Sequence, residues 1–240
     1  MTVVPYKEEK TGKKEQVAKM FDNISHRYDF LNHFLSLGID KGWRKKAIKL
    51  LEPLKPALIL DVATGTGDFA IQALSLKPDK VIGIDISEGM LAVGRKKIEA
   101  KQLSSQVELF SGDSENIPFK ENNFDAVTVA FGVRNFENLE KGLTEIYRVI
   151  KPGGMVVVLE FSRPRTFPFR QIYSFYFKFI LPKIGRFISS DKAAYTYLPE
   201  SVEAFPDGED FLQCLKTVGF KNTKCRALTF GISSIYSGSK

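Results

Sequence analysis

The fold is decided by the stretch Leu58-Ile59-Leu60-Asp61-Val62-Ala63-Thr64-Gly65-Thr66-Gly67-Asp68, in which an apolar run ends in an acid and leads into a Gly-x-Gly turn. Short apolar runs of this kind are typical of strands buried in a parallel sheet. Glycines at 65 and 67 let the backbone turn sharply and approach a ligand with no Cβ in the way. The stretch therefore predicts a strand, a nucleotide-binding loop, and a helix that begins at Thr66 and Asp68.

A second apolar run, Val81-Ile82-Gly83-Ile84, ends in Asp85, eighteen residues after Gly67. A carboxylate at this spacing can accept hydrogen bonds from both ribose hydroxyls of a bound nucleoside. The glycine pattern alone also fits the dinucleotide loop of an NAD-dependent dehydrogenase. Asp61 favours another ligand, because an acid just ahead of the loop suits an ammonium group and would repel a pyrophosphate. S-adenosylmethionine carries that ammonium group together with a sulfonium, so it is the expected cofactor.

The composition fits one α/β domain, because 240 residues with 43% hydrophobic content can bury one substantial core. The net charge of +7 would suit nucleic acid or an anionic membrane surface, but excess lysine is commonly only a solvated face. Cys214 and Cys225 are too few for a disulfide framework or a zinc site, so we expect no metal. No export signal or membrane-spanning segment is recognised, which makes the cytoplasm the expected location.

Apolar β-branched runs alternate with helical segments along the chain, which indicates right-handed crossovers in a doubly wound sheet. The expected strands are residues 58–62, 81–84, 107–111, 126–130, 155–161, 221–228 and 232–237. The expected helices are residues 17–51, 139–149, 207–218 and one from the N-cap Ser87 to Lys101, with 151–154 ending the second of these. We therefore predict an α/β, Rossmann-like fold with a mostly parallel seven-stranded sheet and helices on both faces.

Polar residues also follow the third and fourth strands, at the edge where ligands of open α/β sheets bind. Asp113 can offer a carboxylate to an adenine amino group and Ser114 a hydroxyl or backbone contact, and the alternative is that Asp113 caps a turn. Arg134 and Asn135 stand where a substrate would face the sulfonium, although a surface Arg134 paired with an acid is the alternative. The predicted cofactor site is Asp61, Gly65, Thr66, Gly67, Asp85, Asp113 and Ser114.

Two further segments carry a recognisable pattern. The first runs from Tyr28-Asp29-Phe30-Leu31-Asn32 through Ser36-Leu37-Gly38 to Trp43-Arg44. The second runs from Arg148-Val149-Ile150-Lys151-Pro152-Gly153-Gly154 to Leu159-Glu160-Phe161-Ser162. They resemble the signatures Y-D-x-M-N…S-x-G…W and R-V-L-K-P-G-G…E-x-S of the UbiE/MenG family of quinone C-methyltransferases. The chain departs from that family at Leu31 for Met, Asp40 for a common His and Ala130 for a frequent Ser, so no catalytic role is assigned to Asp40.

The resemblance implies a class I S-adenosylmethionine-dependent methyltransferase that methylates a reduced prenylated quinone ring, converting demethylmenaquinol to menaquinol in menaquinone biosynthesis. It also implies that Arg134, Asn135 and Tyr28 hold and polarise a water that helps to remove a ring hydroxyl proton. Tyr28 as a packed core aromatic is the alternative. The expected single domain, 1–240, comprises a helical cap (1–54), a cofactor-binding core (55–162), an aromatic-rich lid insertion (163–205) and a C-terminal helix with strands (206–240).

The aromatic insertion is the expected partner of the isoprenoid tail. Between Phe169 and Ile188 it contains Tyr173, Phe175, Phe177, Phe179 and Phe187, interspersed with lysines and arginines that could face lipid head groups. A lid packed only on its own core is the alternative. The expected partner is therefore a prenylated quinol, and peripheral contact with the inner face of the membrane and a homodimer are left open.

Three other functions would each use part of these features. A different small-molecule or ubiquinone-pathway C-methyltransferase would use the same cofactor site. A nucleic-acid methyltransferase is disfavoured, because the chain has no catalytic cysteine motif and no N/D-P-P-[YF] tetrad, and because its aromatics cluster in an apolar insertion and not on a basic platform for single strands. A quinone or lipid carrier would keep the apolar insertion but would not need acids around a glycine turn.

Overall fold

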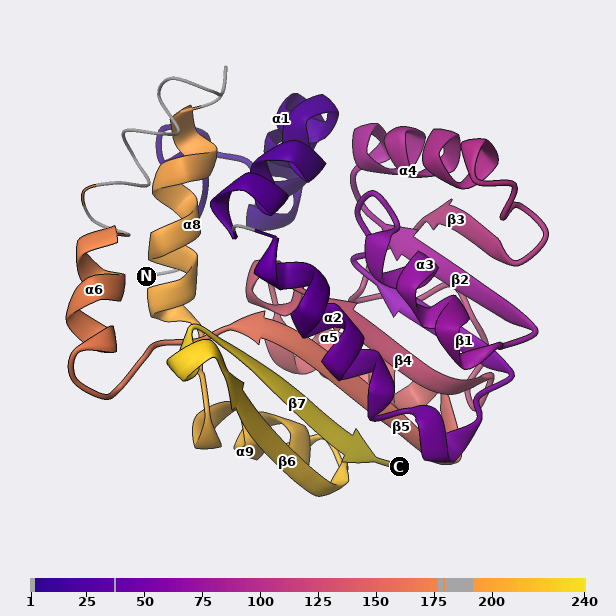
Figure 1. The fold of residues 1–240 in the computed structure, drawn as a ribbon. Coiled ribbons are helices and arrows are strands. Elements are labelled where there is room, and N and C mark those ends of the chain that lie inside the picture. Colours follow the sequence, from indigo (N-terminus) through magenta and orange to yellow (C-terminus); the bar gives the residue numbers. More distant parts are fainter. Residues whose placement is uncertain (1–2, 37, 177–178, 180–191) are drawn as a thin grey trace.

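The computed structural model describes residues 3–36, 38–176, 179 and 192–240. Its centre is a seven-stranded sheet in the order β3-β2-β1-β4-β5-β7-β6 (Figure 1). The strands are β1 Leu58–Val62, β2 Lys80–Asp85, β3 Val107–Ser111, β4 Phe124–Ala130, β5 Ile150–Phe161, β6 Lys221–Leu228 and β7 Ser233–Ser239. Only the pairs that include β7 are antiparallel. The predicted mostly parallel α/β sheet is confirmed.

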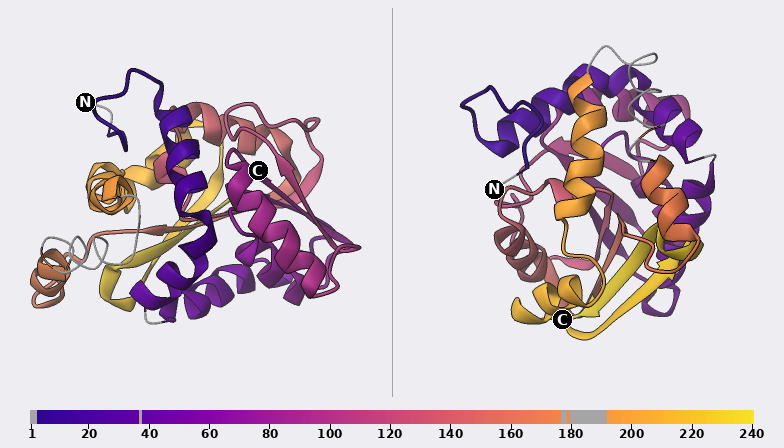
Figure 2. Two further views of the ribbon diagram at one scale, coloured as in Figure 1. Left: turned by 90° about the horizontal axis from the view of Figure 1, so that it is seen from above. Right: turned by 90° about the vertical axis from the view of Figure 1, so that its left-hand side faces the viewer.

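Helices cover both faces of the sheet. In the described part of the chain, the helices of the molecule are α1 Lys13–Leu35, α2 Ile39–Lys49, α3 Asp68–Ala73, α4 Glu88–Ala100, α5 Leu139–Val149, α6 Phe169–Phe175, α8 Lys192–Ala204 and α9 Glu209–Thr217, with short 3-10 turns η1 Glu52–Leu54, η2 Leu74–Leu76, η3 Val133–Asn135 and η5 Thr229–Gly231. One apolar layer contains α2, α3 and α4, and the other contains α5 and α9. Helices α1, α6 and α8 gather beside the carboxyl ends of the strands (Figures 1 and 2).

The alternation of side chains along each strand explains why both faces are covered. In β1, Ile59 packs into the layer of α2, α3 and α4, whereas Leu60 and Val62 pack into the layer of α5 and α9. All three side chains are buried. Because both faces are closed by helices, a ligand can reach the sheet at the strand ends, where the polar residues of the sequence lie.

Several predicted elements have the bounds that the sequence indicated, namely β1, β3, β6 and α5. The Ser87 hydroxyl accepts a hydrogen bond from the backbone N–H of Met90 at 3.2 Å, so Ser87 caps α4 as predicted. The N-terminal helical segment differs in two ways. It begins at Lys13 rather than at residue 17, and it is divided into α1 and α2, with Gly38 in the left-handed conformation (φ 74°) as the N-cap of α2.

The fifth strand begins at Ile150, directly after α5, and not at Met155 as predicted. Residues 151–154 end the preceding helix as predicted, but they already belong to β5, where they form a bulge opposite Phe124 and Ala126 of β4. Gly153 has φ 82°, and a Cβ on Gly154 would lie 2.5 Å from the Asp125 carbonyl oxygen. The two glycines therefore let the strand continue through a region that the Pro-Gly-Gly sequence marked as a break.

In its described residues, the aromatic insertion contains the helices α6 and α8. Helix α8 packs on α1 through Tyr197 and Ala194, while α6 carries exposed apolar side chains. Phe177 and Phe187, which the sequence assigned to the lid, lie outside the described residues, as does most of the segment between α6 and α8. None of the helices in the described part of the chain is long and apolar enough to cross a membrane.

A substitution at Gly94 tests how closely α4 packs on the glycine loop. A Cβ at this position would lie 2.6 Å from Leu109 Cδ1 and 3.1 Å from the backbone carbonyl of Thr66. Although alanine favours helix, we expect Gly94→Ala to lower the free energy of unfolding by about 1–3 kcal/mol through overpacking. Urea denaturation measures this change.

The matched control is Gly42→Ala in α2, where nothing lies within 4 Å of the added methyl group. This variant should gain up to about 1 kcal/mol from its helix propensity alone. Equal stability of the two variants would contradict the tight contact at Gly94.

Candidate active site

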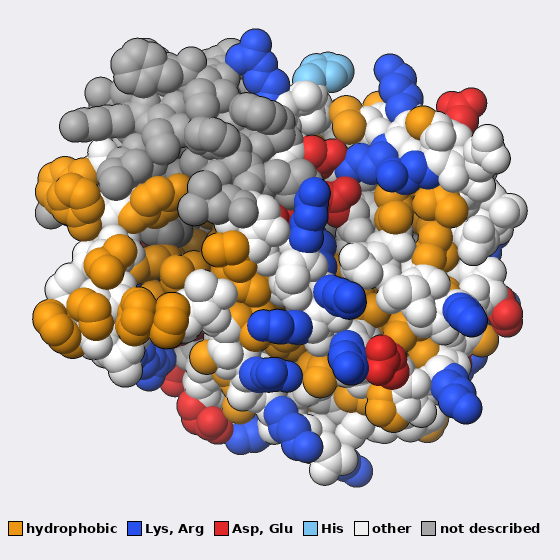
Figure 3. Space-filling view, viewed as in Figure 1, with side chains coloured by type: hydrophobic (Ala, Val, Ile, Leu, Met, Phe, Trp, Pro, Cys, Tyr) orange, Lys and Arg blue, Asp and Glu red, His pale blue; other side chains and the backbone are white. Residues whose placement is uncertain are grey.

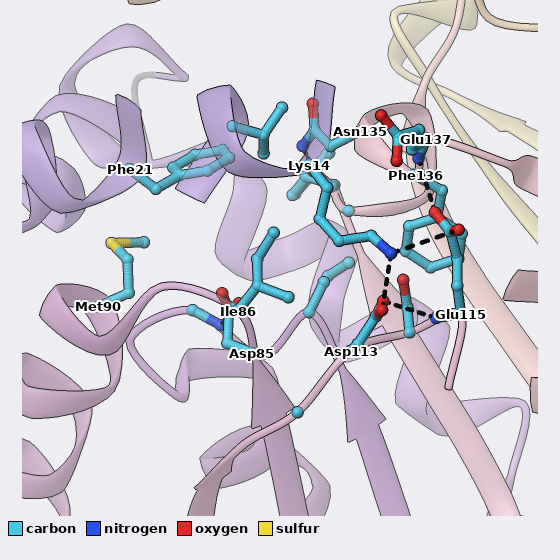
Figure 4. A pocket seen from close by; sticks show the side chains of 18 of the residues that line it. Lys14, Phe21, Asp85, Ile86, Met90, Asp113, Glu115, Asn135, Phe136 and Glu137 are labelled. Atoms are coloured by element: carbon cyan, nitrogen blue, oxygen red, sulfur yellow. Dashed lines mark hydrogen bonds and ion pairs between the residues drawn. The ribbon is translucent and has the colours of Figure 1, made fainter. Parts of the chain in front are cut away.

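A pocket opens at the carboxyl ends of the strands, between the loops after β1, β2, β3 and β4 and the overlying α1 (Figure 4). It encloses about 610 Å³, its open mouth included. Six predicted site residues line it: Tyr28, Gly65, Asp85, Asp113, Ser114 and Asn135. Four others, Asp61, Thr66, Gly67 and Arg134, do not line this pocket. The structure thus places six of the ten predicted site residues at one pocket.

Asp85, at the end of β2, holds the glycine loop in place. Its Oδ2 accepts a hydrogen bond from the backbone N–H of Gly65 at 2.8 Å, and its Oδ1 accepts one from the N–H of Ser87 at 2.9 Å. Gly65 and Gly67 have φ of 55° and 80°, a region that disfavours side chains with a Cβ. Burial raises the pKa of Asp85, although these N–H donors oppose the shift. The carboxylate therefore fixes the loop and still faces the pocket.

Asp61 lies on the neighbouring strand β1, where it pairs with Gly83, and it is hydrogen-bonded to Thr64 at the start of the loop. Its Oδ2 accepts a hydrogen bond from Thr64 Oγ1 at 2.6 Å, and its Oδ1 accepts one from Thr128 Oγ1 at 2.7 Å. Burial raises the pKa of this carboxyl to about 6, and the charge of Asp85 adds to the shift. Asp61 is therefore held in place, but burial makes its ionised form less stable than it would be in water.

Among the described residues, the two acids have no compensating ion pair. In the part of the chain that the structure describes, neither Asp61 nor Asp85 forms a salt bridge with a lysine or arginine, although both are at least nine-tenths buried. Buried carboxylates of this kind favour a cationic ligand, because it restores the interaction with positive charge that burial removes. S-adenosylmethionine, with its ammonium and sulfonium groups, fits this requirement, and a pyrophosphate does not.

Asp113, after β3, has a partner that the sequence did not reveal. Lys14 of α1 places its Nζ 2.7 Å from Asp113 Oδ2 and 3.5 Å from Glu115 Oε2, and all three side chains line the pocket (Figure 4). Asp113 Oδ1 accepts a hydrogen bond from the backbone N–H of Glu115, as a turn cap does. The carboxylate thus combines a structural role with a position at the pocket, and its contact with adenine stays a prediction.

Two acids fasten α1 over the glycine loop and α4, and sequence reasoning had not identified them. Asp29 accepts a hydrogen bond from Thr66 Oγ1 at 2.5 Å and pairs with Lys97 of α4 at 2.5 Å. Asp22 accepts hydrogen bonds from Ser87 Oγ at 2.6 Å and from the N–H of Gly89 at 2.9 Å. The Tyr-Asp pair of the first signature segment was the one available signal for Asp29.

Asp40, which stands where the resembling family commonly has a histidine, has a structural role. It accepts a hydrogen bond from Ser36 Oγ at 2.7 Å and forms a buried ion pair with Arg44. Arg44 lies over the ring of Phe131, 5.8 Å from its centroid, and its charge lowers the pKa of Asp61 against the larger effect of burial. Asp40 thus holds Arg44, whose positive charge favours the ionised form of Asp61.

Arg134 and Asn135 belong to η3, which follows β4. Arg134 is buried, with a side chain 7% exposed, and its Nη1 lies 2.8 Å from Oε1 of Glu160, whose side chain is 0% exposed. The same Nη1 donates to the carbonyl of Phe131, which also accepts a hydrogen bond from Asn135 Nδ2 at 3.5 Å. The alternative of a surface arginine is therefore wrong. Glu160, part of the second signature segment, was missed as the partner of Arg134.

The residue types and geometry agree with three comparisons with known proteins. The model of the ubiE/COQ5 methyltransferase family matches residues 8–240. A Bacteroides fragilis protein named demethylmenaquinone methyltransferase is 50% identical over 99% of this chain and 97% of its own length. A Geobacter sulfurreducens protein named ubiquinone/menaquinone biosynthesis C-methyltransferase UbiE is 46% identical over 96% of this chain and 90% of its own. A solved SAM-dependent methyltransferase from Thermotoga maritima shares the fold, with a TM-score of 0.66, 21% identity, and coverage of 92% of this chain and 99% of its own.

The raised pKa of Asp61 predicts a stability that falls as pH rises. The unfolded chain releases this proton near about pH 4, whereas the folded protein retains it to about 6, so ionisation of Asp61 costs stability between these values. Asp61→Asn cannot ionise and should be more stable than the wild type at pH 7 by on the order of 2 kcal/mol. Urea denaturation across this pH range should show the gain shrinking toward pH 4.

Asp125→Asn is the control of opposite sign. Lys151 and two backbone N–H groups hold the pKa of Asp125 below its usual value, despite partial burial. Its ionised form therefore stabilises the fold above about pH 4, and this variant should lose stability at pH 7. If Asp61→Asn also loses stability there, the account of Asp61 is wrong.

Proposed function

The chain belongs to the ubiE/COQ5 methyltransferase family, and we propose that it methylates a ring carbon of demethylmenaquinol, a reduced prenylated quinone, to form menaquinol. S-adenosylmethionine is the methyl donor. The observation that supports this acceptor most strongly is the full-length similarity to a protein named demethylmenaquinone methyltransferase. An acceptor of the ubiquinone pathway is the second candidate, because another full-length relative is named for both quinones.

The donor would be held by the acids and the glycine loop. Asp85 offers the carboxylate for the ribose hydroxyls, Gly65 a close backbone approach, and Asp113 with Ser114 the contacts to adenine. Asp61, on the neighbouring strand β1, supplies negative charge for the ammonium group. Bound S-adenosylmethionine supplies an electrophilic methyl group, and the remaining task of the chain is to orient the acceptor and to move its proton.

Proton removal from the acceptor falls to η3 and α1. A quinol ring carbon becomes nucleophilic when a neighbouring hydroxyl loses its proton, so the protein must stabilise the resulting oxyanion. The guanidinium of Arg134 lowers the pKa of a nearby hydroxyl, and Asn135 and Tyr28 face the donor pocket and can hold a water that takes the proton. Glu160 keeps the guanidinium in one orientation through the buried ion pair.

The insertion supports a peripheral contact with the membrane, where prenylated quinols reside. Five exposed side chains form what we term the α6 apolar surface: Phe167, Ile172, Phe175, Phe179 and Phe230. Figure 3 shows hydrophobic side chains gathered over this side of the molecule and basic side chains beside them. In this proposal the protein lies in the cytoplasm and inserts the α6 apolar surface into the inner leaflet of the membrane.

The basic neighbours come from α2. Phe169 stacks on Phe230 with ring centroids 3.7 Å apart, and Trp43 Nε1 donates a hydrogen bond to Thr229 Oγ1 at 2.8 Å. These contacts link α6 and η5 to α2, whose exposed lysines are Lys41, Lys45, Lys46 and Lys49. Apolar side chains beside lysines fit an anionic bilayer, because the former enter the acyl boundary while the latter stay at the head groups.

The proposed reaction is tested directly by incubating the protein with methyl-labelled S-adenosylmethionine and chemically reduced, short-chain demethylmenaquinone. We expect label on the quinol ring, located by mass spectrometry. The corresponding benzoquinol is supplied in a parallel incubation. Transfer to the benzoquinol alone would favour the ubiquinone-pathway acceptor, and transfer to neither quinol would contradict the proposal.

Arg134→Lys separates the chemistry from donor binding. Lysine keeps a positive charge opposite Glu160 but loses the planar fork, so the fold should persist while orientation of the acceptor oxygen is lost. We expect quinol turnover to fall by about 100-fold or more and the dissociation constant for the donor to change less than about twofold. A loss of donor affinity comparable to the loss of turnover would refute the assigned role.

Vesicle sedimentation tests the α6 apolar surface. The wild type should bind vesicles that contain phosphatidylglycerol, less so at high salt, and Ile172→Asp should weaken binding by about tenfold. Phe110→Asp is the control, because Phe110 is a comparably exposed apolar residue in β3, at the opposite end of the sheet from β6. Equal binding by both variants, or no binding by the wild type, would exclude this membrane surface.

A further inference from the structure

Three buried polar atoms around η3 and α8 have no hydrogen-bond partner among the described residues. They are Arg134 Nε, Asn135 Oδ1 and the hydroxyl oxygen of Tyr197. Buried polar atoms in folded proteins are nearly always paired, and those that are not are commonly completed by a ligand or an ordered water. Two of the three belong to residues that the proposed reaction already uses, but Tyr197 has had no role so far.

Tyr197 lies on α8, which packs directly on η3. Its side chain is 3% exposed and belongs to an apolar cluster with Val17 and Met20 of α1, against which Phe21 and Ile86 also pack. Val17, Phe21 and Ile86 line the donor pocket as well. The same cluster therefore forms both a wall of the donor pocket and the surroundings of the Tyr197 ring.

The Tyr197 hydroxyl is also close enough to the Arg134–Glu160 pair to sense both charges. The positive charge of Arg134 lowers its pKa and the negative charge of Glu160 raises it, while burial dominates and raises the pKa far above its usual value. Tyr197 consequently stays a neutral O–H donor at any working pH and cannot serve as a base.

We propose that the Tyr197 hydroxyl binds an oxygen of the acceptor ring and so determines specificity for an aromatic ring with two hydroxyl groups. This inference rests on the proposed function. The acceptor carries two ring oxygens, and one of them is assigned to Arg134, Asn135 and Tyr28. A neutral donor held in apolar surroundings suits the other, because it can hydrogen-bond that oxygen without removing its proton. The ring would then be held at two points, which orients the reacting carbon.

Tyr197→Phe removes only the hydroxyl and tests the proposal. We expect kcat/KM for the reduced quinol to fall about tenfold, while the dissociation constant of the donor stays unchanged and the melting temperature is unchanged or higher. Two naphthol analogues, each lacking one of the two ring hydroxyls, serve as competitive inhibitors. The substitution should weaken binding of the naphthol that keeps the oxygen bound by Tyr197. It should not change binding of the naphthol that lacks this oxygen.

Tyr236→Phe is the matched control. Tyr236 is equally buried, but its hydroxyl accepts a hydrogen bond from the N–H of Gly208 at 2.8 Å. Its loss should lower the melting temperature and leave kcat/KM for the quinol unchanged. Two results would refute the role of Tyr197 and leave the proposed function intact, provided that the wild type methylates the quinol. One is an unchanged kcat/KM for Tyr197→Phe, and the other is an equal loss of affinity for both naphthols. If the wild type methylates no quinol, both fail.

Discussion

The structure depends on the placement of two buried carboxylates, Asp61 and Asp85, at the ends of adjacent parallel strands. Both are held by hydroxyl or N–H donors, and neither is paired with a lysine or arginine in the described residues. The sheet order β3-β2-β1-β4 brings them together around the glycine loop. Negative charge that the fold itself does not neutralise is a strong reason for a site to prefer a cationic methyl donor.

Helix α1 connects this charge to the rest of the site. Asp22 and Asp29 fasten it to α4 and to the glycine loop, and Lys14 pairs with Asp113 across the pocket. The same helix presents Tyr28 to the pocket and packs on Tyr197 of α8. Helix α1 therefore contributes side chains both to the donor pocket and to the surroundings of Tyr197.

Much of the fold could be predicted from local patterns, whereas the contacts between distant segments could not. Short β-branched runs located β1 and β3 to the residue, because their periodicity is a local property. Nothing local indicates which face of α1 meets the loop, so Lys14 and Asp29 were missed. Glu160 was missed for the same reason, because only the register of β4 with β5, which pairs Ala130 with Leu159, places Glu160 beside the turn that holds Arg134. The bulge in β5 was hidden because Pro-Gly-Gly is also a frequent turn sequence.

The most direct measurement is the number of protons exchanged when S-adenosylmethionine binds, obtained by titration calorimetry near pH 6 in buffers of different ionisation enthalpy. The pKa of Asp61 is raised to about 6 in the protein without donor, so part of the population carries a proton there. A cation placed near this carboxyl lowers its pKa, and the wild type should therefore release a fraction of a proton as the donor binds. Binding with no proton release, or with proton uptake, would contradict the account.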